Sequence, residues 1–211
     1  MEIIKLEKVN KSFGDKKVLS NFSLLINEGE LIAITGSSGK GKTTILNILG
    51  LLEGFDKGSF WLDGDKNIKP NTSKATKIIR EKISYLFQNF ALVDEESVEY
   101  NLMLALRYVK ISKRQKVEKI KEELSHMGLE GYEKKKIYEL SGGEQQRVAV
   151  ARIMLKPSKI VLADEPTGSL DEKNSEIVFE LLKKINNNGK TVIIVTHDKK
   201  LADKCDRIIN I

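Results

Sequence analysis

Residues 31–44 of this chain read Leu31-Ile32-Ala33-Ile34-Thr35-Gly36-Ser37-Ser38-Gly39-Lys40-Gly41-Lys42-Thr43-Thr44. The first five form a continuous, mainly apolar run, which is typical of a strand buried on both faces of a sheet. A glycine-rich segment follows, and the apolar spacing over residues 43–52 predicts a helix. A strand, a glycine-rich loop and a helix in this order open an α/β unit. We therefore expect an α/β core around this segment.

The glycine-rich segment, residues 36–43, matches the phosphate-binding P-loop pattern. Its glycines let successive backbone N–H groups surround a phosphate, and the start of the helix adds partial positive charge. Lys42 is expected to reach the β- and γ-phosphate oxygens, the Thr43 hydroxyl to ligate Mg²⁺, and Lys40 to face solvent. The sequence thus predicts a nucleoside triphosphate site made of Gly36, Ser37, Ser38, Gly39, Lys40, Gly41, Lys42, Thr43 and Thr44.

The rest of the chain supplies the layers around this unit. Short apolar runs at 83–87, 160–163 and 191–196 are separated by helical patterns, so the core sheet is expected to be mostly parallel. Residues 1–30 alternate as strands do and predict a small antiparallel β layer. Residues 89–157 have helical periodicity without a clear strand and predict an inserted α-helical subdomain. We interpret residues 1–211 as one domain that carries this insertion.

Polar side chains follow three of the apolar runs. Asp164 is placed to hold Mg²⁺ through its water shell, and Glu165 is placed to activate a water. Because the carboxyl ends of parallel strands line one crevice, His197 is expected to contact a γ-phosphate there. Gln88 follows the run at 83–87 and is a candidate ligand for the metal or its water. The alternative for His197 is a structural histidine.

A second phosphate-binding helix start is predicted by Leu140-Ser141-Gly142-Gly143-Glu144-Gln145-Gln146-Arg147. Ser141 and Glu144 form a capping box, and two glycines expose backbone N–H groups at the start of the helix. A protein with one P-loop has no use for a second such helix start within its own site. This stretch resembles the signature motif of the ATP-binding cassette (ABC) ATPases.

The resemblance to ABC ATPases covers the whole chain, in the order Phe13, residues 36–43, Gln88, residues 140–145, Asp164-Glu165, Ser169-Leu170-Asp171 and His197. It implies a RecA-like P-loop NTPase core with ATP and Mg²⁺ as cofactors. It also implies a head-to-tail dimer with a second ATP-binding subunit, which we expect to be a homodimer. The resemblance places Phe13 against adenine and makes Asp171 a residue that joins the two nucleotide sites. It also assigns contacts with the partner's ATP to Ser141, Gly142, Gly143, Glu144 and Gln145.

Two longer stretches indicate a subgroup within this family. Residues 141–149 and 163–171 resemble exporter ATPases that serve macrolide efflux, lipoprotein release and antimicrobial-peptide transport, and residues 85–94 and 98–102 resemble those of bacteriocin exporters. The resemblance implies a separate transmembrane permease and a peptide, lipid-linked or drug-like substrate. The acidic start of the chain lacks signal-peptide features, so we expect a cytoplasmic protein on the inner face of the membrane. Tyr138 departs from the family, where proline commonly precedes the signature.

Composition excludes several other classes of protein. The chain is 40% hydrophobic with a single cysteine, which excludes a disordered chain and a disulfide-stapled mini-protein. The net charge of +6 permits an anionic partner, but the scattered lysines favour solvated surface. DNA-repair ABC ATPases carry long coiled coils, and no heptad run is present, so no nucleic-acid partner is expected. The alternative hypothesis, a non-transporting ABC subunit that passes force or a signal to a membrane partner, remains open. The identity of the neighbouring gene would distinguish the two hypotheses.

Residues 98–109 predict a helix that is apolar on nearly every face. A helix of this kind must be buried on more than one side. Its extra apolar surface either packs inside the protein or receives a cytosolic helix of a membrane partner. The sequence leaves both interpretations open.

Overall fold

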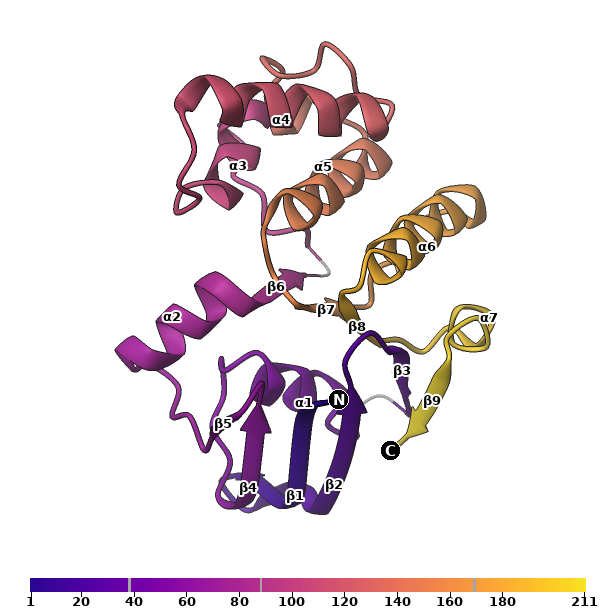
Figure 1. The fold of residues 1–211 in the computed structure, drawn as a ribbon. Helices are drawn as coiled ribbons and strands as arrows, with labels where there is room; N and C mark the ends of the chain where they lie inside the picture. The colour runs from indigo at the N-terminus through magenta and orange to yellow at the C-terminus, as the bar shows by residue number, and fades with distance from the viewer. Residues whose placement is uncertain (38, 88, 169) are drawn as a thin grey trace.

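The computed structural model describes residues 1–37, 39–87, 89–168 and 170–211, and it contains two β-sheets with helices packed on them (Figure 1). The first sheet is antiparallel, with the strand order β2-β1-β4-β5. Its strands are β1 (Glu2–Phe13), β2 (Lys16–Asn27), β4 (Lys57–Leu62) and β5 (Asp65–Lys66). The antiparallel layer expected from residues 1–30 is confirmed, but it is larger than predicted. Strand β4 escaped notice because its alternation, buried Phe60 and Leu62 between less buried neighbours, is only a few residues long.

The second sheet is parallel throughout, with the strand order β6-β7-β8-β3-β9. Its strands are β3 (Leu31–Thr35), β6 (Ile83–Leu86), β7 (Ile160–Asp164), β8 (Thr191–Val195) and β9 (Arg207–Asn210). The four apolar runs of the sequence are confirmed as strands. The edge strand β9 was not predicted, because two polar ends enclose only two apolar residues. Val195 pairs with both Ile34 and Asp164, so β3, β8 and β7 end side by side.

Alternation along the parallel strands divides the core in two. Ile32 and Ile34 of β3 join α1 (Lys42–Leu49) and the antiparallel sheet in one hydrophobic cluster. Leu31, in contrast, faces a second cluster formed with the helices that follow β6 in the sequence, whereas the helix directly before β6, over residues 73–82, packs in the first. Helix α1 therefore lies between the two sheets (Figure 1). It ends earlier than residue 52 because Gly50 caps it and Leu51 takes a left-handed conformation, with φ of 58°.

The helices between β6 and β7 form the upper part of the molecule in Figure 1. They are α3 (Val98–Ala105), α4 (Lys113–His126), the 3₁₀ helix η1 (Ile137–Glu139) and α5 (Gly142–Leu155). The predicted capping box of Ser112 and Gln115 is confirmed at the start of α4, and Gly128 follows its end with φ of 65°. Helix α5 contacts α3, α4 and α6, so it connects this group to the rest of the protein.

Three further helices complete the described chain, namely α2 (Ser73–Lys82), α6 (Glu172–Asn187) and α7 (Lys199–Ala202). Helix α2 precedes β6, while α6 and α7 flank β8 in the sequence. Across the four described ranges, no helix combines the length and the apolar character needed to cross a membrane.

Candidate functional site

The loop between β3 and α1 has a backbone that requires glycine at several points. Gly36, Gly39 and Gly41 have φ values of 150°, 78° and 97°. A Cβ on Gly36 would lie 2.6 Å from the carbonyl oxygen of Ile211, and one on Gly41 would lie 2.8 Å from Cγ1 of Val18. The loop is thus held closely against β2 and the chain after β9. Among the described residues no side chain caps α1, which leaves its first N–H groups available to an anion.

Lys42 lies over this loop. Its ammonium donates to the carbonyl oxygens of Gly36 at 2.8 Å and Ser37 at 3.2 Å, at the place where the P-loop pattern positions phosphates. Lys40 is exposed, as predicted, and so are Ser37 and Gly39, while Thr44 is half-buried in α1. The predicted site residue Ser38 lies outside the described residues.

The predicted metal ligands Thr43 and Asp164 meet across the gap between α1 and β7. The Thr43 hydroxyl lies near enough to the Asp164 carboxylate to act on its pKa. Burial raises the pKa of Asp164, and so does the neighbouring charge of Glu165, whereas Thr43 and Lys42 act in the opposite direction. A hydroxyl and a carboxylate are the hard oxygen donors that Mg²⁺ prefers when phosphates supply the rest of its shell. The pair therefore fits a magnesium ion. Gln88, the third predicted ligand, lies outside the described residues.

Glu165 and His197 form a contact at the ends of β7 and β8. A carboxylate oxygen of Glu165 lies 2.9 Å from Nδ1 of His197, and the His197 backbone N–H donates to the other oxygen at 3.4 Å. Glu165 itself has φ of 44°, in the left-handed region, and its N–H donates to the Val195 carbonyl at 2.9 Å. The His197 side chain is 72% exposed, so it is not a buried structural histidine.

Phe13 ends β1, and its side chain is 48% exposed. The Lys11 ammonium lies 4.6 Å from the centre of the Phe13 ring. Because Val18 of β2 approaches Gly41, the hairpin of β1 and β2 lies against the phosphate-binding loop. The ring is thus on the hairpin beside the loop, with an exposed face.

The signature segment starts α5 as the capping box predicts. Ser141 Oγ accepts from the Glu144 N–H at 3.4 Å, and the Glu144 carboxylate accepts from the Ser141 N–H at 2.8 Å and its hydroxyl at 2.7 Å. These bonds, together with one from the Tyr132 hydroxyl at 3.0 Å, lower the pKa of Glu144. The Gln145 amide donates to carbonyl groups of its own chain, those of Ile137 and Leu140. Figure 1 shows α5 among the upper helices and α1 between the lower sheets.

Asp171 caps α6, and the side chain of Asn174 lies between Asp171 and the signature segment. Its carboxylate accepts from the N–H of Asn174 at 2.8 Å and from its Nδ2 at 2.7 Å, and these bonds lower the pKa of Asp171. A Cβ on Gly143 would lie 2.9 Å from Oδ1 of the same Asn174. Asn174 was not predicted from the sequence, where it is one polar residue in an amphipathic helix. Asn174 lies between the start of α5 and the start of α6.

Residues 19–168 match the protein family described as ABC transporter. This chain belongs to the ABC transporter family. It is 38% identical, over all of its length, to the macrolide export ATP-binding/permease protein MacB of Mannheimia succiniciproducens, of which it covers 33%. It is 37% identical, over 98% of its length, to the probable syringafactin export ATP-binding/permease protein SyfD of Pseudomonas syringae, of which it covers 32%. The chain spans about a third of the length of these relatives.

Solved structures of ABC cassettes have the same fold. A dimeric structure of the ATP-binding cassette MJ0796, in a post-hydrolysis state with ADP and Pi, aligns with a TM-score of 0.89 and 38% identity. The alignment covers 99% of this chain and 94% of that one. The cbiO1 protein of Clostridium perfringens, part of the cbiONQ transporter complex, aligns with a TM-score of 0.86 and 27% identity over 99% and 84%. The expected ABC fold is therefore confirmed over nearly the whole chain.

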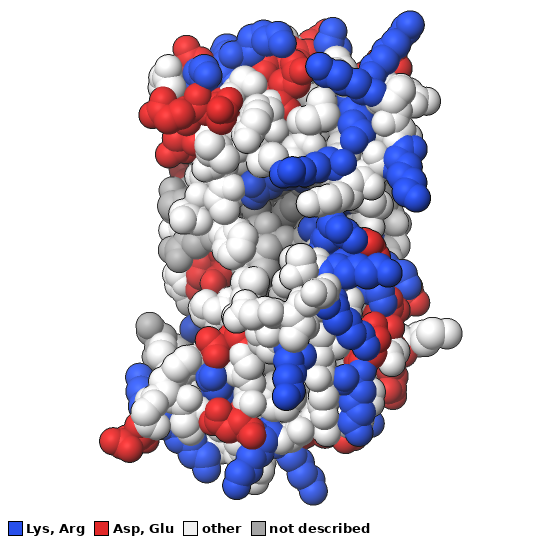
Figure 2. Space-filling model, turned by 90° about the vertical axis from the view of Figure 1, so that its left-hand side faces the viewer, with Lys and Arg blue, Asp and Glu red and all other residues white. Residues whose placement is uncertain are grey.

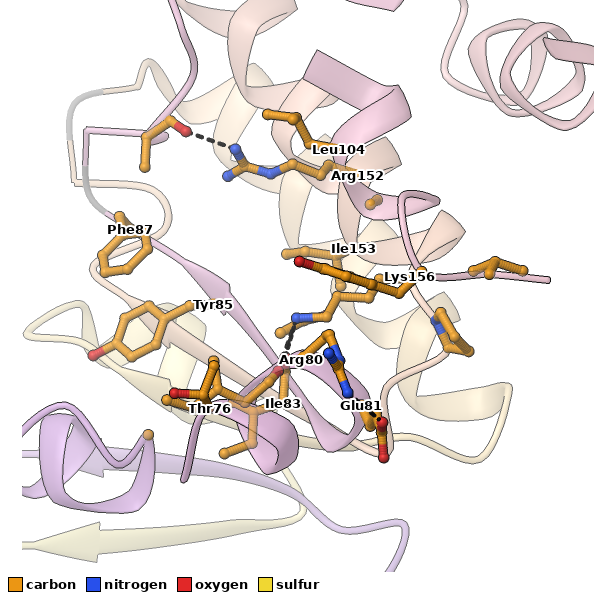
Figure 3. A pocket seen from close by; sticks show the side chains of 18 of the residues that line it. Thr76, Arg80, Glu81, Ile83, Tyr85, Phe87, Leu104, Arg152, Ile153 and Lys156 are labelled. Atoms are coloured by element: carbon orange, nitrogen blue, oxygen red, sulfur yellow. Dashed lines mark hydrogen bonds and ion pairs between the residues drawn. The ribbon is translucent and has the colours of Figure 1, made fainter. Parts of the chain in front are cut away.

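This ABC chain also has a large groove, about 1020 Å³, between α2, β6, α3 and the end of α5 (Figure 3). Leu104 and Tyr108 belong to the predicted apolar helix, which ends at residue 105 and continues as a turn. Both side chains are exposed and line the groove. Basic residues gather around the same hollow in Figure 2, and the groove is lined by Arg80, Lys110, Arg152 and Lys156.

Lys156 differs from the interpretation of the scattered lysines as solvated surface, and Arg152 beside it is also partly buried. Arg152 is half-buried and donates to the carbonyls of Phe90 at 2.7 Å and Ala91 at 2.6 Å. Lys156 donates to the carbonyls of Ile79 at 3.0 Å and Ile83 at 2.5 Å (Figure 3). Burial lowers the pKa of Lys156 to about 8, and the charge of Arg152 adds to the effect. The acceptors of both side chains are carbonyls more than 60 positions away in the sequence, so no local pattern indicated these contacts.

Proposed function

We propose that this chain binds and hydrolyses ATP with Mg²⁺ and powers an exporter. The observation that supports this most directly is the gathering of Lys42, Thr43, Asp164, Glu165 and His197 at the carboxyl ends of β3, β7 and β8. Lys42 and the start of α1 bind the phosphates, and Phe13 stacks on the adenine. Relatives that carry "export" in their names support the direction of transport.

The chemistry assigned to this site is transfer of the terminal phosphoryl group to water. Thr43 and Asp164 would hold Mg²⁺, with Gln88 as a further ligand of the metal or of the water. When bound, the ion neutralises charge that develops on the β- and γ-phosphate oxygens. Glu165 accepts the proton of the attacking water, and His197, held against Glu165, contacts the γ-phosphate.

The proposed assembly is a head-to-tail homodimer. The start of α5 offers Ser141, Gly142, Gly143, Glu144 and Gln145 to the nucleotide on the partner's P-loop. Asp171 joins the two nucleotide sites of this dimer. Support comes from the separation of α5 and α1 within one chain and from the dimeric cassette of similar fold (Figure 1).

The proposed membrane partner is a transmembrane permease that docks a cytosolic segment in the groove beside α3. The apolar side chains of Leu104 and Tyr108 and the basic lining favour an amphipathic segment with acidic groups. The chain would then act as a single nucleotide-binding domain, with residues 89–157 as its helical subdomain, on the inner face of the membrane. A peptide, lipid-linked or drug-like compound is the proposed cargo, and a bacteriocin is its narrowest version.

The hydrolysis proposal is tested by two variants and their mixture. Glu165→Gln should lower turnover by about 10²–10⁴-fold while ATP still binds, because only the proton acceptor is lost. Ser141→Arg should also stop turnover, because it blocks the second helix start. Mixing the two creates one composite site with an intact Glu165 and an intact signature, so hydrolysis should return to a fraction of the native rate. Normal turnover by Ser141→Arg alone would rule out the head-to-tail dimer.

The docking proposal is tested by a charge in the groove. Leu104→Asp should abolish co-purification with the permease and leave ATP-driven dimerisation intact. Ile177→Asp is the matched control, since Ile177 is a similarly exposed apolar residue on α6 outside the groove. Equal loss of the permease with both variants, or with neither, would place the docking surface elsewhere.

A further inference from the structure

A buried amide lies one turn beyond the signature start of α5. Gln146 is 1% exposed, on the face of α5 whose other members are apolar. Its Nε2 donates to the backbone carbonyl of Pro166. Its Oε1 is buried with no hydrogen-bond partner among the described residues, so this amide costs stability that an apolar side chain would not, and the cost suggests a role beyond packing.

The carbonyl that Gln146 binds belongs to the segment that follows Glu165. Glu165 has φ of 44°, and its carbonyl accepts from the Gly168 N–H at 3.1 Å, which closes a tight turn. A residue other than glycine stays in this conformation only when its surroundings hold it there. Gln146 supplies one such constraint, from α5, directly after the carboxylate that acts in hydrolysis.

The chain that follows this segment also approaches α5, at the start of α6. Asn174 binds Asp171 through its backbone and its side chain, and it lies against Gly143 at the start of α5. Pro166 and Asn174 therefore each contact the signature helix, the first through Gln146 and the second beside Gly143. These contacts offer a physical route by which the position of the start of α5 could bear on Glu165.

We propose that Gln146 is a positioning residue that couples the two nucleotide sites of the dimer. This inference rests on the proposed ATP hydrolysis in a head-to-tail dimer. There, the start of α5 serves the partner's nucleotide, while Glu165 serves the nucleotide on its own chain. Through Gln146, the position of the signature at one site sets the position of the proton acceptor at the other.

The composite site provides the test, because it separates the two functions onto two chains. In a mixture of Glu165→Gln and Ser141→Arg chains, the first supplies the working signature and the second supplies the working Glu165. Gln146→Met keeps the length of the side chain and removes the donor. Placed on either chain, it should lower hydrolysis about ten- to a hundredfold, the scale of a small misplacement of reacting groups.

A matched control separates coupling from loss of stability. Asn101 is a fully buried amide that binds the backbone of Val93 and Ser97 within the upper helices. Asn101→Met should lower the melting temperature to a similar degree and leave composite hydrolysis unchanged. If Gln146→Met acts from one chain only, or from neither, coupling is refuted. Absence of hydrolysis in the mixture without Gln146→Met would instead refute the proposed function.

A second variant keeps the test valid if Gln146→Met folds poorly. In Gln146→Glu, the protonated carboxyl donates to the Pro166 carbonyl and the ionised one repels it, and burial raises the pKa of such a carboxyl. The rate of the variant relative to the native protein should therefore rise as the pH falls. A ratio that stays flat with pH in a folded variant would overturn the role of this hydrogen bond.

Discussion

The first turns of helices α1 and α5 differ in how their backbone N–H groups are capped. Helix α1 follows a left-handed Gly41 and has no side-chain cap, and the ammonium of Lys42 lies over the loop before it. Helix α5 is capped by its own residues, since Ser141 and Glu144 satisfy each other's N–H groups. A capped helix start is stable without a ligand, whereas an uncapped one gains from an anion. The chain thus carries one helix start that would gain from an anion and one that its own side chains already cap.

Loss of Lys42 should have the largest effect on this contrast. In native protein, ATP at about 100 times its dissociation constant should add roughly 2.7 kcal/mol to the free energy of unfolding. Lys42→Ala should remove this gain, while Ser141→Arg should keep it, because the first acts at α1 and the second at α5. Thermal unfolding with and without ATP and Mg²⁺ measures both. An equal ATP-induced shift in native and Lys42→Ala proteins would break the comparison.

The far end of α5 gives a smaller effect that depends on pH. Because burial lowers the pKa of Lys156 to about 8, the unfolded chain binds this proton more tightly than the folded one. Stability should therefore rise as the pH goes from about 8 towards 10.4, the usual value of lysine. Relative to Lys156→Met, the native protein should gain on the order of 1–2 kcal/mol over this range, after allowance for partial exposure. Urea unfolding at several pH values checks the slope, and parallel curves would contradict the burial of this charge.

Removing the N-cap of α5 tests how much the capping box contributes to stability. Ser141→Ala should lower the free energy of unfolding by about 1 kcal/mol without ATP. Helix α1 offers no matching loss, because Gly41 caps it with no side chain. Chemical denaturation of the variant and the native protein provides the measurement. A stability unchanged by Ser141→Ala would mean that the capping box contributes nothing in this protein.

Glu144→Gln should have the smallest effect, since glutamine keeps the geometry of the capping box. Only the favourable charge at the positive end of α5 is lost, which costs about 0.3 kcal/mol at an exposed site. Because hydrogen bonds lower the pKa of Glu144, this contribution is present above its unfolded pKa and is lost as the pH falls through the folded value. The native protein and the variant should therefore become equally stable in acid. A difference that persists there would assign the effect to shape rather than charge.

Local motifs made most of the fold and site predictable. The P-loop glycines, the capping boxes and the apolar runs each act over a few residues, so their outcome follows from neighbours in the sequence. Strand β4 and edge strand β9 were missed because partners far along the chain, β1 and β3, complete them. The burial of Arg152 and Lys156 was missed for the same reason, since their acceptors are the carbonyls of residues more than 60 positions away. Gln146 could have been noticed as an amide on an otherwise apolar stripe.

The position of Lys42 has a consequence for selectivity. Its ammonium already has two acceptors within its own loop, the carbonyls of Gly36 and Ser37. A ligand must therefore compete with groups that are tethered to the lysine at a high effective concentration. A neutral acceptor of equal strength gains no free energy by replacing these carbonyls. A charged phosphate oxygen is a stronger acceptor and can replace them. We therefore expect the carbonyls of the loop to weaken the binding of any ligand whose charged groups do not reach Lys42.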